Sequence, residues 1–164
     1  MSIVLTRIDN RLIHGQVLET WLPHVHANCL VVANDEIASS PLKRMMMEAS
    51  VPSRIRVEIG TVAEITRLFC CGDLDDLRVL LLFATTGDSL AALRGGLLYE
   101  RLNLGNLHAG EGKTQFSCTV FLDPDDVENL EQIDSAGVDI SARCIPADTP
   151  RNWRRLIPAK KADS

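Results

Sequence analysis

The sequence lacks any apolar run long enough to cross a membrane. Its longest uninterrupted apolar run covers residues 79–84, far below the roughly 20 residues that a spanning helix needs. The N-terminus also lacks a basic region followed by a long apolar stretch and a small-residue cleavage site. We therefore predict no secretion signal and a cytoplasmic location.

An excess of positive charge is also missing. The chain has 17 lysines and arginines against 22 aspartates and glutamates, a formal net charge of -5. Because affinity for polyanions comes from clustered Lys and Arg that neutralise phosphates, this balance argues against a general nucleic-acid binder.

Disulfide and metal frameworks are not evident either. The five cysteines are an odd number, and the adjacent Cys70 and Cys71 are poorly placed to bridge without strain. His24 and His26 are two residues apart, but no cysteine or carboxylate lies at a convincing partner spacing. We predict reduced thiols and no metal site.

What the sequence does contain is an alternation of short apolar segments and amphipathic ones. Its 164 residues fit one domain, and the alternation predicts an α/β fold with a mostly parallel sheet covered on both faces. Strands are predicted over residues 3–6, 29–33, 55–59, 78–84, 114–122 and 138–145, and helices over 17–22, 41–49, 62–70, 88–94 and 124–136. Pro23 is expected to end the first helix.

Several sulfur-containing residues fall within these predicted elements. Cys29, Cys118 and Cys144 lie in predicted strands, so we predict that all three pack in the core. The run of methionines at 45–47 is predicted to serve helix packing, with use at an interface as the alternative.

The most informative segment is residues 7–17, which read RIDNRLIHGQV. His14 stands where a strand turns into a helix, with Arg7 and Arg11 in the same loop, an arrangement suited to accepting and releasing a phosphoryl group. Gly15 removes a side chain where a phosphate would approach the backbone, and Arg7 and Arg11 could then bind phosphate oxygens. Asp9 could orient the imidazole or an arginine. The alternative is a surface turn whose charges pair with one another.

Two other motifs near the expected carboxyl edge of the sheet need separate interpretation. Asn34 and Asp35 follow the second strand and could shape the same pocket, although helix capping is the simpler role for Asp35. Lys113 and Thr114 end a segment that imitates a phosphate-binding P-loop. That motif fails because Leu107 stands where its first glycine belongs and a strand follows where a helix is required.

Taken together, these motifs resemble the IIB component of the mannose/fructose/sorbose family of the bacterial phosphoenolpyruvate-dependent sugar phosphotransferase system. The resemblance begins with RIDNRLIHGQV and Trp21. It continues through VVANDEIA at 31–38, VLLLFA at 79–84, LNLGNLHAGEGK at 102–113 and the closing strand with Pro146 and Asp148. It therefore covers nearly the whole chain.

The resemblance implies a single three-layer α/β/α domain over residues 1–164 that carries phosphate on Nδ1 of a histidine. His14 occupies that position, and Arg7, Asp9 and Arg11 match the family's neighbouring arginines and aspartate. It places the phosphate against Gly15, Gln16 and Asn34, with no cofactor and no metal; the roles of His108 and Lys113 stay open. Two arginines and backbone donors suit a nearly balanced transfer between histidines.

The implied partners are a IIA protein as phosphate donor, IIC/IID membrane permease subunits, and a sugar as final acceptor. The domain would then be cytoplasmic and peripherally associated with the membrane subunits, and a homodimer is possible. Two alternatives use the same loop: a regulatory phosphocarrier that never phosphorylates a sugar, and a module that binds phosphate esters without forming a covalent adduct.

Overall fold

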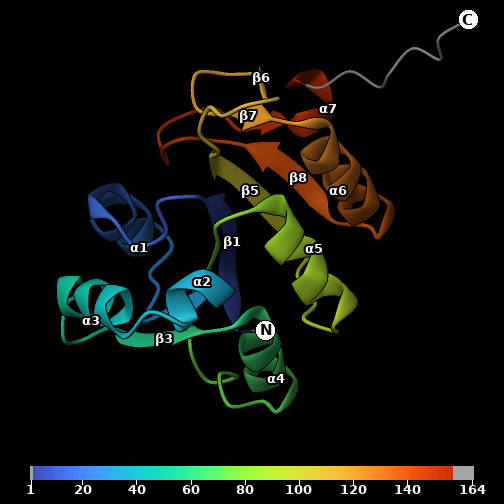
Figure 1. Ribbon diagram of the computed structural model, residues 1–164. Coiled ribbons are helices and arrows are strands. Elements are labelled where there is room, and N and C mark those ends of the chain that lie inside the picture. The colour runs from blue at the N-terminus through green and yellow to red at the C-terminus, as the bar shows by residue number, and fades with distance from the viewer. Residues whose placement is uncertain (1, 157–164) are drawn as a thin grey trace, which may run out of the picture.

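A computed structural model describes residues 2–156 (Figure 1). Its main sheet has seven strands in the order β3-β2-β4-β1-β5-β8-β9, and all pairs are parallel except β8 with β9. A separate antiparallel pair joins β6 and β7. The strands are β1 (Ile3–Asp9), β2 (Cys29–Ala33), β3 (Arg56–Gly60), β4 (Val79–Phe83), β5 (Arg101–Asn106), β6 (Thr114–Gln115), β7 (Phe121–Leu122), β8 (Asp139–Ala142) and β9 (Arg151–Asn152).

Helices cover both faces of the main sheet, which confirms the three-layer α/β prediction (Figure 1). The helices are η1 (Val17–Trp21), α1 (Leu22–His24), α2 (Asp35–Ala38), α3 (Pro41–Ser50), α4 (Val62–Cys70), α5 (Thr86–Arg94), α6 (Pro124–Ser135) and α7 (Trp153–Leu156). Side chains from η1 to α3 build the core on one face, and side chains from α4 to α7 build the core on the other. No helix of the described residues is long and apolar enough to cross a membrane.

The middle strands are the most apolar parts of the chain because both of their faces are covered. All five residues of β2 and all five of β4 are buried, as expected for parallel strands between two helical layers. Cys29 in β2 is fully buried as predicted, and burial raises its pKa to about 11.

Two local predictions were wrong, and one strand was not predicted. The first helix does not stop at Pro23: residues 15–24 are helical, and Pro23 lies in the short α1 directly after the π-helical turn of η1, where the regular hydrogen-bond ladder of an α-helix is already interrupted. Residues 114–122 form a hairpin, not one strand. The strand β5 was not predicted at all, because polar and small residues interrupt its leucines.

Two sulfur-based predictions also fail. Cys118 lies in the turn of the hairpin and is exposed, while Cys144 follows β8 and is partly exposed. In α3, Met45 and Met46 are 60% and 63% exposed, so only Met47 packs against the core. Both errors have one cause: the local pattern of apolar residues does not specify whether a segment lies in the core or at the surface of the fold.

The strand order places the first loop at a point where neighbouring connections diverge. The connection that leaves β1 runs through η1 and α1 on one face of the sheet, and the connection that leaves the adjacent β4 runs through α5 on the other. In parallel α/β sheets, ligands bind outside the carboxyl ends of strands at such a switch point. The loop with His14 starts there.

Candidate functional site

The loop that follows β1 is held in one shape by its own apolar residues. Leu12 has a φ of 58°, which a side chain other than glycine adopts at some cost. Its side chain and that of Ile13 are buried against the core on the η1 face, which offsets that cost. The backbone N–H of Leu12 also donates to the Asp9 carbonyl at 2.9 Å. These contacts fix the turn between Asp9 and His14.

Asp9 is the centre of the site, because its carboxylate accepts hydrogen bonds from five N–H groups. Oδ1 accepts from the backbone N–H and Nε of Arg11, at 3.1 and 3.0 Å. Oδ2 accepts from Nη2 of Arg7, Nη2 of Arg11 and Nε2 of His14. Burial disfavours the charged form, but the bonds from His14 and Arg11 outweigh it and hold the pKa of Asp9 well below its usual range.

His14 meets this carboxylate through one ring nitrogen. Nε2 lies 3.1 Å from Oδ2 of Asp9, and the side chain is 16% exposed. Since Asp9 is ionised and can only accept, Nε2 must carry the proton. In a neutral imidazole, Nδ1 then has the free lone pair. The geometry therefore leaves Nδ1 as the nucleophilic atom.

Arg7 does not lie where sequence reasoning placed it. Its side chain is completely buried, with Nη1 donating to the Asn103 amide oxygen and, at 2.8 Å, to the Arg143 carbonyl. Nη2 donates to Asp9 and, at 3.0 Å, to the Cys144 carbonyl. These contacts give no support to the predicted contact of Arg7 with phosphate, because both Nη groups are used within the protein and one of them holds Asp9.

Arg11 has the opposite surroundings. Its side chain is 42% exposed, with Nε and Nη2 on Asp9 and Nη2 also donating to Oε1 of Gln16 at 3.0 Å. Within the described residues Nη1 makes no hydrogen bond and is left for an incoming anion. Gln16 thus orients Arg11. The start of the helix is open at Gly15, because a Cβ added there would meet no atom within 4 Å.

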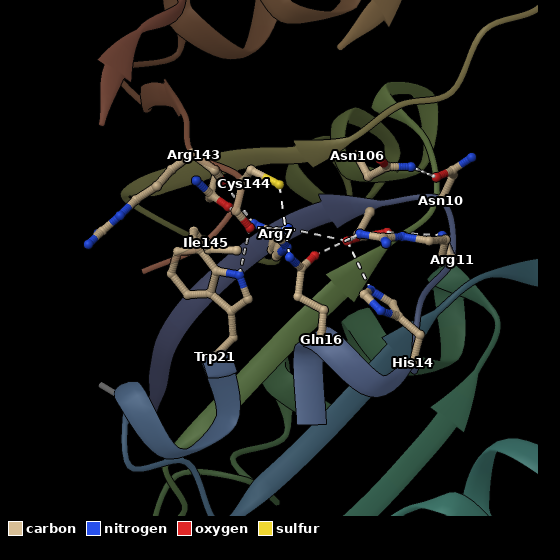
Figure 2. Close-up of polar contacts among 12 residues, drawn as sticks. Arg7, Asn10, Arg11, His14, Gln16, Trp21, Asn106, Arg143, Cys144 and Ile145 are labelled. Carbon is tan, nitrogen blue, oxygen red and sulfur yellow. Dashed lines mark hydrogen bonds and ion pairs between the residues drawn. The ribbon is translucent and has the colours of Figure 1, made fainter. Parts of the chain in front are cut away.

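Two further residues of the site were not identified from the sequence as part of it. The indole N–H of Trp21 donates to the Cys144 carbonyl at 3.1 Å, and the Arg7 guanidinium carbon lies 4.8 Å from the ring centroid (Figure 2). Asn103 comes from the unpredicted β5. A signal for Trp21 existed in the motif itself, but Asn103 could be found only from the pairing of β5 with β1.

Asn34 and Asp35 lie at the carboxyl edge of the sheet but apart from the Asp9 group. Asn34 caps α2, accepting from the Ile37 N–H at 2.9 Å, and its amide donates to Asp88 at 3.0 Å. Asp35 accepts from the backbone N–H of Val62 at 2.9 Å and so caps α4. With both ends of the Asn34 side chain in use, its predicted role in phosphate binding receives no support from these contacts.

The remaining candidates are not part of this group. Lys113 pairs with Asp126 at 3.3 Å, and His24, His26 and His108 are exposed. No cluster of three or more potential metal ligands occurs among residues 2–156.

The family model of the PTS system sorbose subfamily IIB component, where PTS is the phosphotransferase system, matches residues 3–164. The chain belongs to this family of IIB components. It is 36% identical over 157 residues to the N-acetylgalactosamine-specific phosphotransferase enzyme IIB component 2 of Escherichia coli K12, covering 95% of this chain and 99% of that one. It is 30% identical to the sorbose-specific EIIB component of Klebsiella pneumoniae, covering 93% of each.

Solved structures agree with this assignment. The crystal structure of the IIBSor domain of the sorbose permease from Klebsiella pneumoniae matches with a TM-score of 0.92 at 28% identity, over 99% of both chains. The N-acetylgalactosamine-specific IIB component 1 from Escherichia coli matches with a TM-score of 0.86 at 30% identity, over 92% of this chain and 98% of that one. This IIB component is thus a phosphotransferase component of a sugar uptake system. Members of its family work with IIA and membrane IIC/IID components.

Proposed function

We propose that this IIB component accepts a phosphoryl group on Nδ1 of His14 from a IIA phosphohistidine and passes it to a sugar at a IIC/IID membrane complex. The observation that carries the proposal is the contact of Nε2 with the ionised Asp9, because it fixes the tautomer that leaves Nδ1 unprotonated. The whole chain would act as one phosphocarrier domain on the cytoplasmic side of the membrane.

The transfer has a simple atom balance. The Nδ1 lone pair forms the new N–P bond while the bond from phosphorus to the donor imidazole nitrogen breaks, and that nitrogen keeps the electron pair. The proton on Nε2 stays between His14 and Asp9, whose negative charge stabilises the imidazolium character of the phosphorylated ring. In passage to the sugar, a hydroxyl oxygen of the sugar forms the new bond to phosphorus. The N–P bond breaks, its electron pair returns to Nδ1, and the hydroxyl proton is released to solvent.

Charge on the transferring group would be balanced by Arg11 and by the start of the helix that follows His14. Nη1 of Arg11 is unengaged within the described residues, and the open space at Gly15 gives an anion access to the first N–H groups of the helix. Such contacts stabilise the metaphosphate-like transition state without any metal ion. Gln16 contributes by holding Arg11, while Arg7 contributes through Asp9.

The names of the relatives do not agree on one sugar. They specify N-acetylgalactosamine, sorbose, mannose and fructose in different relatives. We therefore propose a sugar acceptor as a class, whose identity would be set by the membrane subunits.

The test is to incubate the protein with phosphoenolpyruvate, the general phosphotransferase proteins and a IIA protein. The mass of the protein is then measured by mass spectrometry. We expect one acid-labile phosphoryl group on the wild type and none on His14→Ala. The matched control is His26→Ala, which removes an exposed histidine outside the Asp9 group and should be labelled like the wild type. Label on His14→Ala would refute the assignment.

The same labelled protein separates transport from regulation. Added to vesicles that contain IIC/IID subunits, it should lose its phosphoryl group with formation of an equal amount of sugar phosphate. A protein that is labelled but gives no sugar phosphate with any such complex would be a regulatory phosphocarrier.

A further inference from the structure

Trp21 has no part in the transfer as described so far, yet it is among the most completely buried large side chains. It is 2% exposed, and its indole N–H donates to the Cys144 carbonyl oxygen at 3.1 Å. The same oxygen accepts from Nη2 of Arg7 at 3.0 Å. The guanidinium of Arg7 also lies over the Trp21 ring, with its central carbon 4.8 Å from the ring centroid. Trp21 therefore holds both Arg7 and the carbonyl to which Arg7 donates.

The contacts continue from Arg7 to the histidine. Nη2 of Arg7 donates to Oδ2 of Asp9 as well as to the Cys144 carbonyl, and Oδ2 is the oxygen that meets Nε2 of His14. Nη1 is anchored separately, on the Asn103 side chain and the Arg143 carbonyl. A shift of the Cys144 carbonyl would thus move the one nitrogen of Arg7 that touches the acceptor of the His14 proton (Figure 2).

From this chain of contacts we infer that Trp21 is a positioning residue for phosphoryl transfer: it acts through the Cys144 carbonyl and Arg7 to hold Asp9 Oδ2 against Nε2 of His14. Without the indole N–H, the carbonyl loses a donor and Arg7 loses a fixed acceptor. Asp9 then selects the Nε2–H tautomer less strongly, and a larger share of His14 carries its proton on Nδ1, where it blocks attack on phosphorus. The consequence for transfer rests on the proposed function, but the tautomer effect does not.

The chain offers a matched control in its other tryptophan. Trp153 is completely buried, its indole N–H donates to Asp134 at 2.6 Å, and the guanidinium carbon of Arg154 lies 4.4 Å from its ring centroid. It packs in the core on the opposite face of the sheet. Trp153→Phe therefore loses the same chemical group from a similar environment without touching the Asp9 group.

The experiment compares Trp21→Phe with Trp153→Phe in the full chain. Long-range proton–nitrogen NMR correlations of the His14 ring report which nitrogen carries the proton, and a single-turnover assay gives the rate of phosphoryl uptake from IIA. We expect Trp21→Phe to raise the Nδ1–H fraction and to slow uptake about 10- to 100-fold, the size of effect that a small misplacement produces. Trp153→Phe should keep the wild-type tautomer and rate, even where both variants lose thermal stability.

The outcomes separate this inference from the proposed function. If Trp21→Phe keeps the tautomer and the rate of Trp153→Phe, the inference is wrong. If the wild type takes up no phosphate, the proposed function fails, and the NMR comparison still decides the role of Trp21. If Trp21→Phe does not fold, the Trp21 indole can be replaced with benzothiophene in the Trp153→Phe variant, where Trp21 is the remaining tryptophan of the sequence. This replacement keeps the shape of the ring and removes only the N–H. It must raise the Nδ1–H fraction of His14 as expected for Trp21→Phe.

Discussion

Arg7 and Arg11 belong to one short motif and have opposite surroundings. Arg7 is completely buried and its Nη groups donate to four protein oxygens, whereas the side chain of Arg11 is 42% exposed. The difference arises because Arg7 is within β1 and points toward Trp21, while Arg11 is in the turn beyond the strand. At the residue scale, both arginines hold Asp9, but Arg7 also donates to three further protein oxygens, whereas Arg11 keeps Nη1 without a hydrogen bond in the described residues and available to an anion.

This contrast predicts different defects for the two alanine variants. Arg11→Ala should lose less stability than Arg7→Ala, because its side chain is 42% exposed and the backbone N–H of residue 11 keeps its bond to Asp9. It should take up phosphate on the order of 100-fold more slowly, as for loss of one transition-state charge contact. Arg7→Ala should lower the free energy of unfolding by about 3–5 kcal/mol, because it removes one partner of the buried Asp9 and also the donors to three further oxygens inside the protein. Urea unfolding and single-turnover phosphoryl uptake measure the two effects. Equal loss of stability in both variants would contradict this contrast.

At the scale of elements, β5 decides how Arg7 can be buried. It pairs with β1 so that Asn103 lies beside Arg7, and two residues later Gly105 faces the guanidinium. A Cβ at Gly105 would overlap the Arg7 guanidinium, so only glycine leaves the space that the side chain occupies. These polar and small residues are the reason that the strand was not predicted. On the face of β5 that would be apolar in an ordinary core strand, Asn103 accepts a hydrogen bond from Arg7 and Gly105 leaves space for its guanidinium.

Gly105→Ala should therefore act like a partial loss of Arg7. We expect the variant to displace the guanidinium, destabilise the protein by about 1–3 kcal/mol as overpacked cores do, and slow phosphoryl uptake. Thermal unfolding and the transfer assay measure both. Gly137→Ala is an informative comparison, because Gly137 has a φ of 94° but open space at its Cβ and lies outside the Asp9 group; it should destabilise without slowing uptake. A Gly105→Ala protein with normal uptake would show that Arg7 tolerates displacement.

At the scale of the whole molecule, buried carboxylates tie stability to pH. Asp9 and Asp126 sit in different parts of the fold, and in each case burial opposes ionisation while hydrogen bonds outweigh it and lower the pKa. For Asp126 the largest of these bonds comes from Thr86 at 2.6 Å. Because the folded pKa lies below the unfolded one, each group adds stability above the ordinary aspartate pKa and loses it as the pH falls through the folded value.

The free energy of unfolding should consequently decrease as the pH is lowered below about 4, where unfolded aspartates bind protons first. Asp9→Asn should be less stable than the wild type at neutral pH and should lose stability more gradually below about pH 4. Asp139→Asn, at an exposed position of β8, should follow the wild-type profile. Urea unfolding at a series of pH values measures the slopes, and parallel slopes for wild type and Asp9→Asn would contradict a charged, buried Asp9.

The sequence by itself determined the α/β class, the apolar strands β2 and β4, the place of His14 at the start of a helix, and the family. These features depend on local periodicity and on a contiguous motif, which the order of residues records directly. The tertiary structure decided which arginine is buried, which imidazole nitrogen is free, and that Trp21 reaches a carbonyl 123 residues away. Those outcomes depend on which strands flank β1 and in what register, and no local pattern specifies that pairing.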